Sequence, residues 1–206
     1  MELTINSYCK IKDNQYFRNG ELEFSSDSKI LANEFLTALY RNKQIGYPKY
    51  FKMDNLAKTG FLAIELLLQN TEMYGENSVY NTGLYIVNSS SSLDTDEEYQ
   101  ATIGQEYFPS PSVFVYTLPN IVNGEIAIKH KFYGENIFFV SKSFDNQAFF
   151  DYIYQSFVET EMQNAIVGWV DYYKQKSEAF VMLVERNDDE QKIKFNKELV
   201  LKLYNL

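Results

Sequence analysis

The side chains that most often carry chemistry are scarce in this sequence. Cys9 is the only cysteine, so it cannot form an internal disulfide. His130 is the only histidine, so one cysteine and one histidine cannot complete a Cys/His zinc site. Cys9 is predicted to be a half-buried strand thiol. His130 is predicted to lie at a helix end, where a partial positive charge suits the carbonyl end of the helix dipole. We therefore expect no chemistry that depends on cysteine or histidine, and no cofactor.

An acidic cluster is the second candidate. Asp94, Asp96, Glu97 and Glu98 follow each other closely, and carboxylates are the ligands that calcium prefers. A calcium loop, however, places its oxygen ligands at alternating positions around a central glycine, which is missing here. These acids are instead expected to form the solvated start of a helix, where negative charge suits the dipole. We expect no metal site.

The composition indicates a folded domain and bears on the partners that it could bind. The chain has 206 residues, of which 45% are hydrophobic and 17% aromatic, so it is expected to form one folded domain over residues 1–206 with a substantial core. Nineteen basic and 28 acidic side chains give a net charge of −9. A field of that sign repels phosphate backbones and anionic lipids. Nucleic acid and membranes are therefore not expected as partners.

The N-terminal segment has no basic start, apolar stretch or small-residue cleavage site of the kind that marks a signal peptide. No apolar run approaches the roughly 20 residues that span a bilayer. We therefore expect a cytoplasmic location.

Apolar spacing predicts the elements that would position any site. Alternation is typical of strands, and steps of three and four residues are typical of helices. Helices are predicted over Ile30–Tyr40, residues 52–70 with Asp54 near the start, a segment capped by Asp94 or Thr95, residues 119–131 with Pro119 first, Asp145–Glu159, and the C-terminal tail. Strands are predicted over Leu3–Ile11, Gly83–Val87, Asn136–Ser141, Asn164–Val170 and Ala179–Glu185. This alternation predicts an α/β fold with parallel strands and crossover helices.

An ordered series of short motifs resembles the N-terminal half of the β-ketoacyl synthases, which belong to the thiolase-like superfamily. The match runs over about Tyr50 to Glu185, and the nearest likeness is to the small ketosynthase-like proteins of bacterial aryl polyene and flexirubin pigment clusters. The residues that carry it are Phe51–Asp54 opening a helix, Ser89–Asp94 after a strand, Ser110-Pro111 with Phe114, Thr117–Asn120, Gly124, and Gly134–Asn136 before a strand.

The resemblance assigns a position to the family nucleophile. Family members carry an acylated cysteine on the strand-to-helix turn after this strand, and an ungapped count from Gly134 puts Ser143 there. The family's two catalytic histidines lie in the C-terminal half, which has no counterpart here, and His130 matches neither. A hydroxyl needs an adjacent base to attack a thioester, so Ser143 is predicted to have lost the chemistry.

The resemblance also implies half of the thiolase-like condensing-enzyme fold, with a mixed sheet of five strands and helices on both faces. The helix from Pro119 would then lie in the central layer with an open apolar face, which usually marks an interface. The strand Asn136–Ser141 lies near the subunit dyad in that family. The predicted interface residues are Ile121, Val122, Ile126, Phe138 and Phe139.

Three functions follow from these expectations. The first is a catalytically silent subunit, similar to a chain-length factor, in the biosynthesis of fatty-acid-type, polyketide-type or aryl polyene acyl chains. Its partner would be a full-length ketosynthase, with an acyl carrier protein as a further partner. The second is an acyl-transfer or thioesterase enzyme that uses Ser143. The third is a homodimeric scaffold without an acyl ligand.

Overall fold

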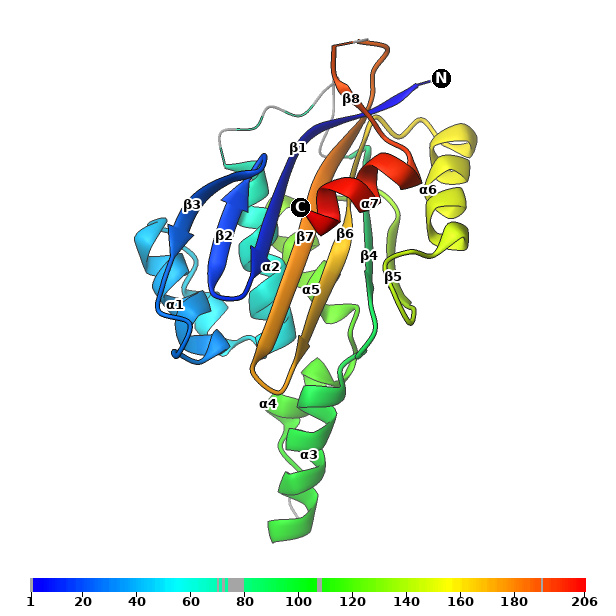
Figure 1. Cartoon of the computed structure of the whole chain (residues 1–206). Helices are drawn as coiled ribbons and strands as arrows, with labels where there is room; N and C mark the ends of the chain where they lie inside the picture. Colours follow the sequence, from blue (N-terminus) through cyan, green and yellow to red (C-terminus); the bar gives the residue numbers. More distant parts are fainter. Residues whose placement is uncertain (1, 70, 72, 74–79, 107–108, 190) are drawn as a thin grey trace.

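The computed structural model describes residues 2–69, 71, 73, 80–106, 109–189 and 191–206. Its strands form one mixed sheet in the order β3-β2-β1-β7-β6-β4-β5, with β8 paired to β1 (Figure 1). The strands are β1 (Leu3–Lys12), β2 (Gln15–Arg18), β3 (Glu21–Ser25), β4 (Thr82–Asn88), β5 (Asn136–Val140), β6 (Asn164–Tyr173), β7 (Lys176–Arg186) and β8 (Ile193–Lys194). Strand β4 is parallel to β5 and β6, whereas β7 is antiparallel to both β6 and β1.

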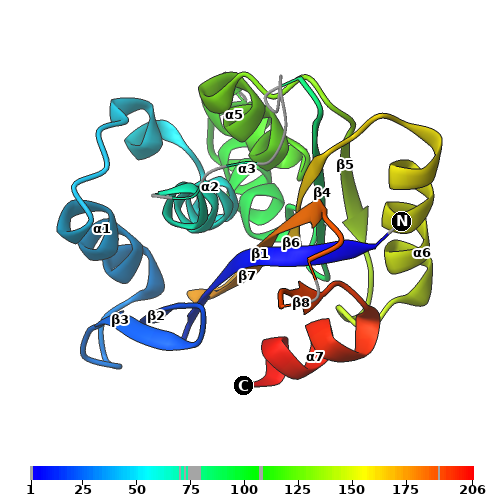
Figure 2. The same cartoon turned by 90° about the horizontal axis from the view of Figure 1, so that it is seen from above.

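Helices cover both faces of this sheet, as Figure 2 shows from above. The helices are α1 (Ala32–Asn42), η1 (Pro48–Lys52), α2 (Asn55–Leu68), α3 (Leu93–Glu106), α4 (Pro111–Phe114), η2 (Val115–Thr117), α5 (Ile121–His130), α6 (Gln147–Glu159) and α7 (Lys197–Asn205). Side chains of α1, α2 and α5 form one hydrophobic core against the sheet, and side chains of α6 and α7 form the other. Helix α3 projects away from the body.

The predicted helices and strands are present, with shifts at their ends, and Asn70, the last residue of the helix predicted over residues 52–70, lies outside the described residues. Parallel pairing holds only for β4 with β5 and β6, because β7 follows β6 after a tight turn and pairs with it antiparallel. Helix α3 begins at Leu93, so Asp94 and Thr95 lie in its first turn instead of capping it. Asn120 is the N-cap of α5, so Pro119 precedes the cap. The sheet has eight strands where five were expected, because the hairpin β2–β3 and the short β8 were not predicted.

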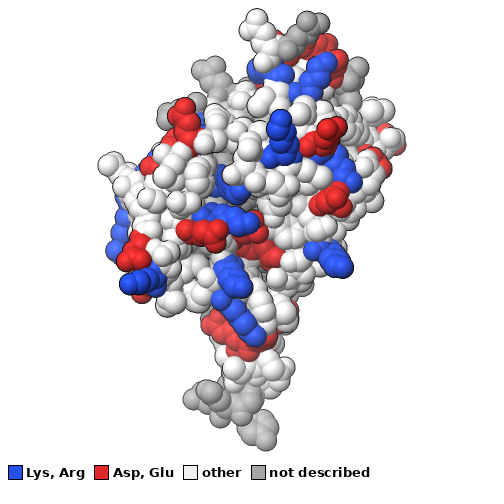
Figure 3. All heavy atoms as spheres, in the orientation of Figure 1, with Lys and Arg blue, Asp and Glu red and all other residues white. Residues whose placement is uncertain are grey.

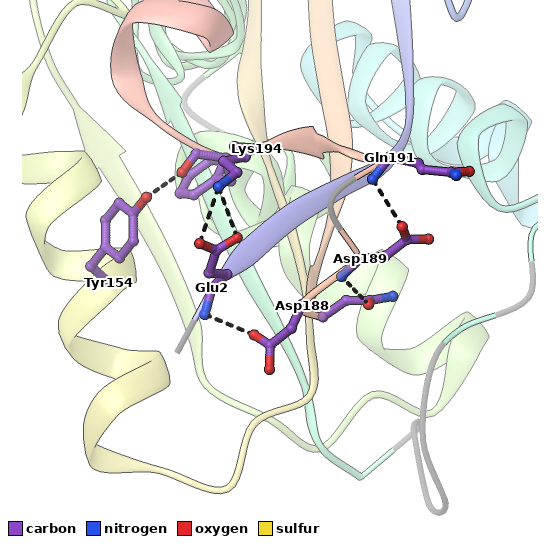
Figure 4. Close-up of polar contacts among 8 residues, drawn as sticks. Glu2, Tyr154, Asp188, Asp189, Gln191 and Lys194 are labelled. Carbon is purple, nitrogen blue, oxygen red and sulfur yellow. Dashed lines mark hydrogen bonds and ion pairs between the residues drawn. The ribbon is translucent and has the colours of Figure 1, made fainter.

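The chain end that carries α7 is fastened to the start of the sheet (Figure 4). Lys194 of β8 pairs with the Glu2 carboxylate at 3.1 Å, and the Glu2 amide donates to Asp188 at 3.2 Å. From α6, the Tyr154 hydroxyl donates to the carbonyl of Phe195 just before α7. These bonds hold the segment before α7, and the helix itself lies in front of β7 and β6, with Lys10 of β1 donating to the carbonyl of Tyr204 near its end.

Candidate functional site

The turn between β5 and α6 holds Ser143. The Ser141 amide donates to the Asn88 carbonyl of β4 at 2.8 Å, and the Ser141 hydroxyl donates to the Ser143 carbonyl at 3.1 Å. Asn146 caps α6 and donates from its side chain to Ser141 at 2.9 Å. Phe144 is buried and anchors the turn in the core. The backbone of this turn is therefore fixed by hydrogen bonds and packing.

The Ser143 side chain itself is exposed and unsupported. None of the described residues donates to its hydroxyl or accepts from it, so no described base is in place to take its proton. It also lies three residues before the Asn146 cap, outside the first turn of α6, where the helix dipole is strongest. Among the described residues, therefore, no side chain is placed to activate the Ser143 hydroxyl.

His130 and Ser143 lie on opposite faces of the sheet. His130 is the last residue of α5, as expected, and α5 packs on the face of the sheet opposite the core that holds Phe144. Its Nε2 lies 2.5 Å from Oε1 of Glu65 on α2, and its ring stacks on Phe132. His130 therefore ties α5 to α2. Cys9 lies on a strand as predicted, but it is fully buried instead of half-buried, and its thiol donates to the Ala63 carbonyl.

The prediction that Val122 or Ile126 faces outward is wrong. They are 2% and 1% exposed, because α5 packs on α2 where Gly60 has no side chain. A Cβ at Gly60 would lie only 2.5 Å from Cγ1 of Val122. A Cβ at Gly124, by contrast, would meet nothing within 4 Å. Ile121 is partly buried, and the apolar residue of α5 that does point to solvent is Ile128, at 67% exposure.

Strand β5 lies at the edge of the sheet, with β4 on one side and no described strand on the other. Phe138 and Phe139 are half-buried, because their rings pack into the two cores of the chain. The Glu135 carbonyl and the Ser141 amide form hydrogen bonds with β4. Because successive residues of a strand point their backbone N–H and C=O groups to opposite sides, those of residues 136, 138 and 140 point to the open side. At this edge, a partner would therefore meet backbone before aromatic rings.

Exposed apolar side chains are found on β5 and on the projecting arm, which we define as α3, α4 and η2. Val140 is 58% exposed at the end of β5, and Phe114 and Leu118 are 56% and 57% exposed on and just after the arm. Asp54 fastens the arm to the body, because its carboxylate caps α2 at Ala57 and accepts from Thr95 of α3 at 2.6 Å. Burial raises the pKa of Asp54 to about 6.

The acidic cluster lies at the start of α3, as predicted. Asp94 accepts from the Lys174 amide at 2.9 Å, and Glu97 accepts from the Tyr173 hydroxyl at 2.8 Å, so both hold the β6–β7 turn. Within the part of the chain that the structure describes, no group of three or more His, Cys, Asp or Glu side chains is arranged to hold a metal ion. No helix among the same residues is long and apolar enough to cross a bilayer.

No protein-family model matches this sequence, and no curated protein does. Solved structures do resemble it. On the ishigamide ketosynthase/chain length factor the match covers 93% of this chain and 64% of that chain, with a TM-score of 0.67 at 12% identity. On a ketosynthase in complex with its chain length factor from Xenorhabdus doucetiae it covers 91% and 80%, with a TM-score of 0.58 at 11% identity.

A β-ketoacyl synthase from Burkholderia phymatum is similar over 91% of this chain and 59% of that chain, with a TM-score of 0.58 at 11% identity. The chain thus spans less than two thirds of the ishigamide and Burkholderia chains that it matches. These likenesses establish the fold, which is the thiolase-like ketosynthase fold expected from the sequence motifs.

Proposed function

We propose that this chain is a catalytically silent, ketosynthase-like subunit that pairs with a full-length ketosynthase, in the manner of a chain-length factor. The product class would be a fatty-acid-type, polyketide-type or aryl polyene acyl chain. The observation that carries the proposal is Ser143, an exposed hydroxyl with no described base at the position where the resemblance expects an acylated cysteine.

The proposed lack of catalytic activity is argued from the proton of the Ser143 hydroxyl. A serine hydroxyl attacks a thioester only when a neighbouring base takes its proton, and the one histidine is engaged with Glu65 on the opposite face. The alternative, an acyl-transfer or thioesterase enzyme that uses Ser143, would need a base that moves into place. Incubating the purified chain with an acyl thioester separates the two, because the alternative requires an acyl mass increment on Ser143.

The open edge of β5 is the surface proposed for pairing. Unpaired strand edges associate readily with another strand, and the exposed Val140 and Ile128 would be covered as the edge is joined. The nearby arm adds Phe114 and Leu118. We propose a full-length ketosynthase on this edge, in a complex that an acyl carrier protein visits, and a homodimer is the outcome that the test must separate from it.

Co-expression with the ketosynthase encoded nearest to this gene tests the pairing by co-purification and light scattering. Val140→Pro removes an N–H on the open side of β5 without touching the bonds to β4, whereas Val140→Thr keeps it. We expect the proline variant to lose the complex and the threonine variant to keep it. A monomer in both the presence and absence of the ketosynthase contradicts the proposal, and a homodimer that excludes the ketosynthase supports the scaffold function instead.

A further inference from the structure

A hollow of about 220 Å³ lies where the arm meets the body of the protein. Residues of η1, the start of α2, α3, α4 and η2 line it. Its titratable side chains are Lys52, Asp54, Lys58, Glu98 and Tyr116. The hydroxyl of Tyr116 is already engaged, because it donates to Glu125 at 3.2 Å. The other four groups therefore decide what the hollow can bind.

Lys58 places an amine without a counter-charge in this hollow. The residue is partly buried, and its side-chain nitrogen has no hydrogen bond or ion pair with a described residue. Burial lowers the pKa of Lys58, and the charges of Asp54 and Glu98 raise it by less. The positive end of the helix dipole acts in the same direction as burial, because Lys58 lies near the start of α2. A larger fraction of this amine is therefore uncharged and nucleophilic than at an exposed lysine.

The Asp54 carboxyl lies one helical turn from this amine. The Lys58 amide donates to the Asp54 carbonyl at 2.9 Å, and a spacing of four residues puts both side chains on the same face of α2. Burial raises the pKa of Asp54 to about 6; Thr95, the Ala57 amide and Lys58 lower it by less, and Asp94 raises it slightly. A fraction of this carboxyl is therefore protonated near neutral pH. The two side chains supply a nucleophile and a general acid to the same small space.

The lining of the hollow favours a neutral, polar ligand. Lys52 and Lys58 contribute two basic groups, and Asp54 and Glu98 contribute two carboxyl groups, so an anion gains no net attraction. Glu98 is exposed and has no described partner, so its carboxylate can accept from a ligand hydroxyl. The volume is below that of sites for drug-sized ligands and suits about two to four carbons. A small hydroxyaldehyde meets these requirements and offers a carbonyl carbon to the amine.

We propose that Lys58 forms an imine with a small, neutral hydroxyaldehyde that enters this hollow. The uncharged amine attacks the carbonyl carbon and gives a carbinolamine. The carbinolamine hydroxyl leaves as water with the proton of Asp54, so the products are a protonated imine and the Asp54 carboxylate beside it. Water reverses the reaction, and no oxidant or reductant takes part. The inference goes beyond the proposed function, because it involves neither Ser143 nor the β5 edge, and either can fail without the other.

Glycolaldehyde, a two-carbon hydroxyaldehyde, is the probe. Limiting glycolaldehyde and cyanoborohydride at neutral pH convert each imine to a stable hydroxyethyl amine, and peptide mass spectrometry gives the rate at each lysine. Lys131 is the internal reference, because it is exposed and follows α5 outside the hollow. We expect Lys58 to react at least about fivefold faster than Lys131, and to lose this preference in concentrated urea. Propanal, which lacks the hydroxyl, and glyoxylate, which is anionic, should show at most a weak preference.

Asp54→Asn tests the general acid. Removing the Asp54 charge also lowers the pKa of Lys58 and frees more amine, so a slower reaction reports the lost proton donor. We expect the rate at Lys58 to fall at least about tenfold and the rate at Lys131 to stay unchanged. Glu161→Gln, which removes an exposed carboxylate outside the hollow, is the matched control and should react like the wild type. Equal rates at Lys58 and Lys131, an equal preference with propanal, or a wild-type rate at Lys58 in Asp54→Asn would each overturn the proposal.

Discussion

Replacing Asp54 with asparagine should change how the stability of the protein depends on pH. Burial raises the pKa of this carboxyl from 3.8 to about 6, and hydrogen bonds from Thr95 and Ala57 lower it by less. The folded state therefore binds a proton more tightly than the unfolded state. It follows that the stabilising contribution is fully present below about pH 3.8 and is lost as the pH rises through about 6.

The size of the change in unfolding free energy follows from the pKa shift of Asp54. A change of about two units corresponds to about 3 kcal/mol between the protonated and ionised forms. The asparagine would have no charge to bury, and its side chain fits the same contacts: its carbonyl can accept from the Ala57 amide, and its side-chain amide can donate to the Thr95 hydroxyl. We therefore expect the variant to gain up to about 3 kcal/mol over the wild type at pH 7.5 relative to pH 4.

Urea unfolding of both proteins at pH 4 and pH 7.5 measures this double difference, in which all other titrating groups cancel. Thr95→Val serves as a second variant, because losing the hydroxyl that donates to Asp54 raises the carboxyl pKa further and moves the transition to higher pH. Unfolding free energies of the wild type and Asp54→Asn that change in parallel between the two pH values would refute the reasoning.

Three shorter predictions follow. Ile126→Asp should unfold the protein, seen as a collapsed circular dichroism spectrum, because the charge would be buried between α5 and α2; a native spectrum would contradict this. Lys174→Asn combined with Gln175→Gly should raise the unfolding free energy by about 1 kcal/mol in a urea titration, because both residues hold positive φ in a tight turn; a lower midpoint would count against it. Ser143→Cys should release no carbon dioxide from malonyl carrier protein above a no-enzyme control, because no described base accompanies the new thiol.

The central elements could be predicted because their residues carry strong local patterns. Asp54 and the apolar spacing after it locate α2, and the short apolar run from Gly83 to Val87 locates β4. The hairpin β2–β3 was not predicted because both strands are short, with four and five residues, and β3 is mostly exposed. Its best signal was the dipeptide Asn19-Gly20, whose positive φ angles of 48° and 86° make the turn.

The orientation of α5 could not be predicted for a different reason. Its spacing shows that Val122 and Ile126 share an apolar face, but spacing does not reveal which neighbour covers that face. The answer depends on Gly60 of α2, a residue distant in sequence that lets the two helices approach closely.

The position of α7 limits which surfaces of this fold a partner could cover. Val200 and Phe195 are 0% and 1% exposed, so the C-terminal segment covers the face of the sheet next to α6, while α1, α2 and α5 cover the other (Figure 2). With both faces covered by the chain itself, a partner gains little from stacking on the sheet. The edge at β5 remains, together with the apolar side chains of the arm.

The distribution of surface charge also favours a contact at the β5 edge over one on the face that α7 crosses. On the face that α7 crosses, basic and acidic side chains are interspersed (Figure 3). Its ion pairs include Lys12 with Glu178 and Lys194 with Glu2. Such a charged surface is solvated and loses that hydration if it is covered, whereas β5 offers unpaired backbone groups and the exposed Val140. Pairing should therefore extend the sheet sideways from β5 and leave the face with α7 exposed to solvent.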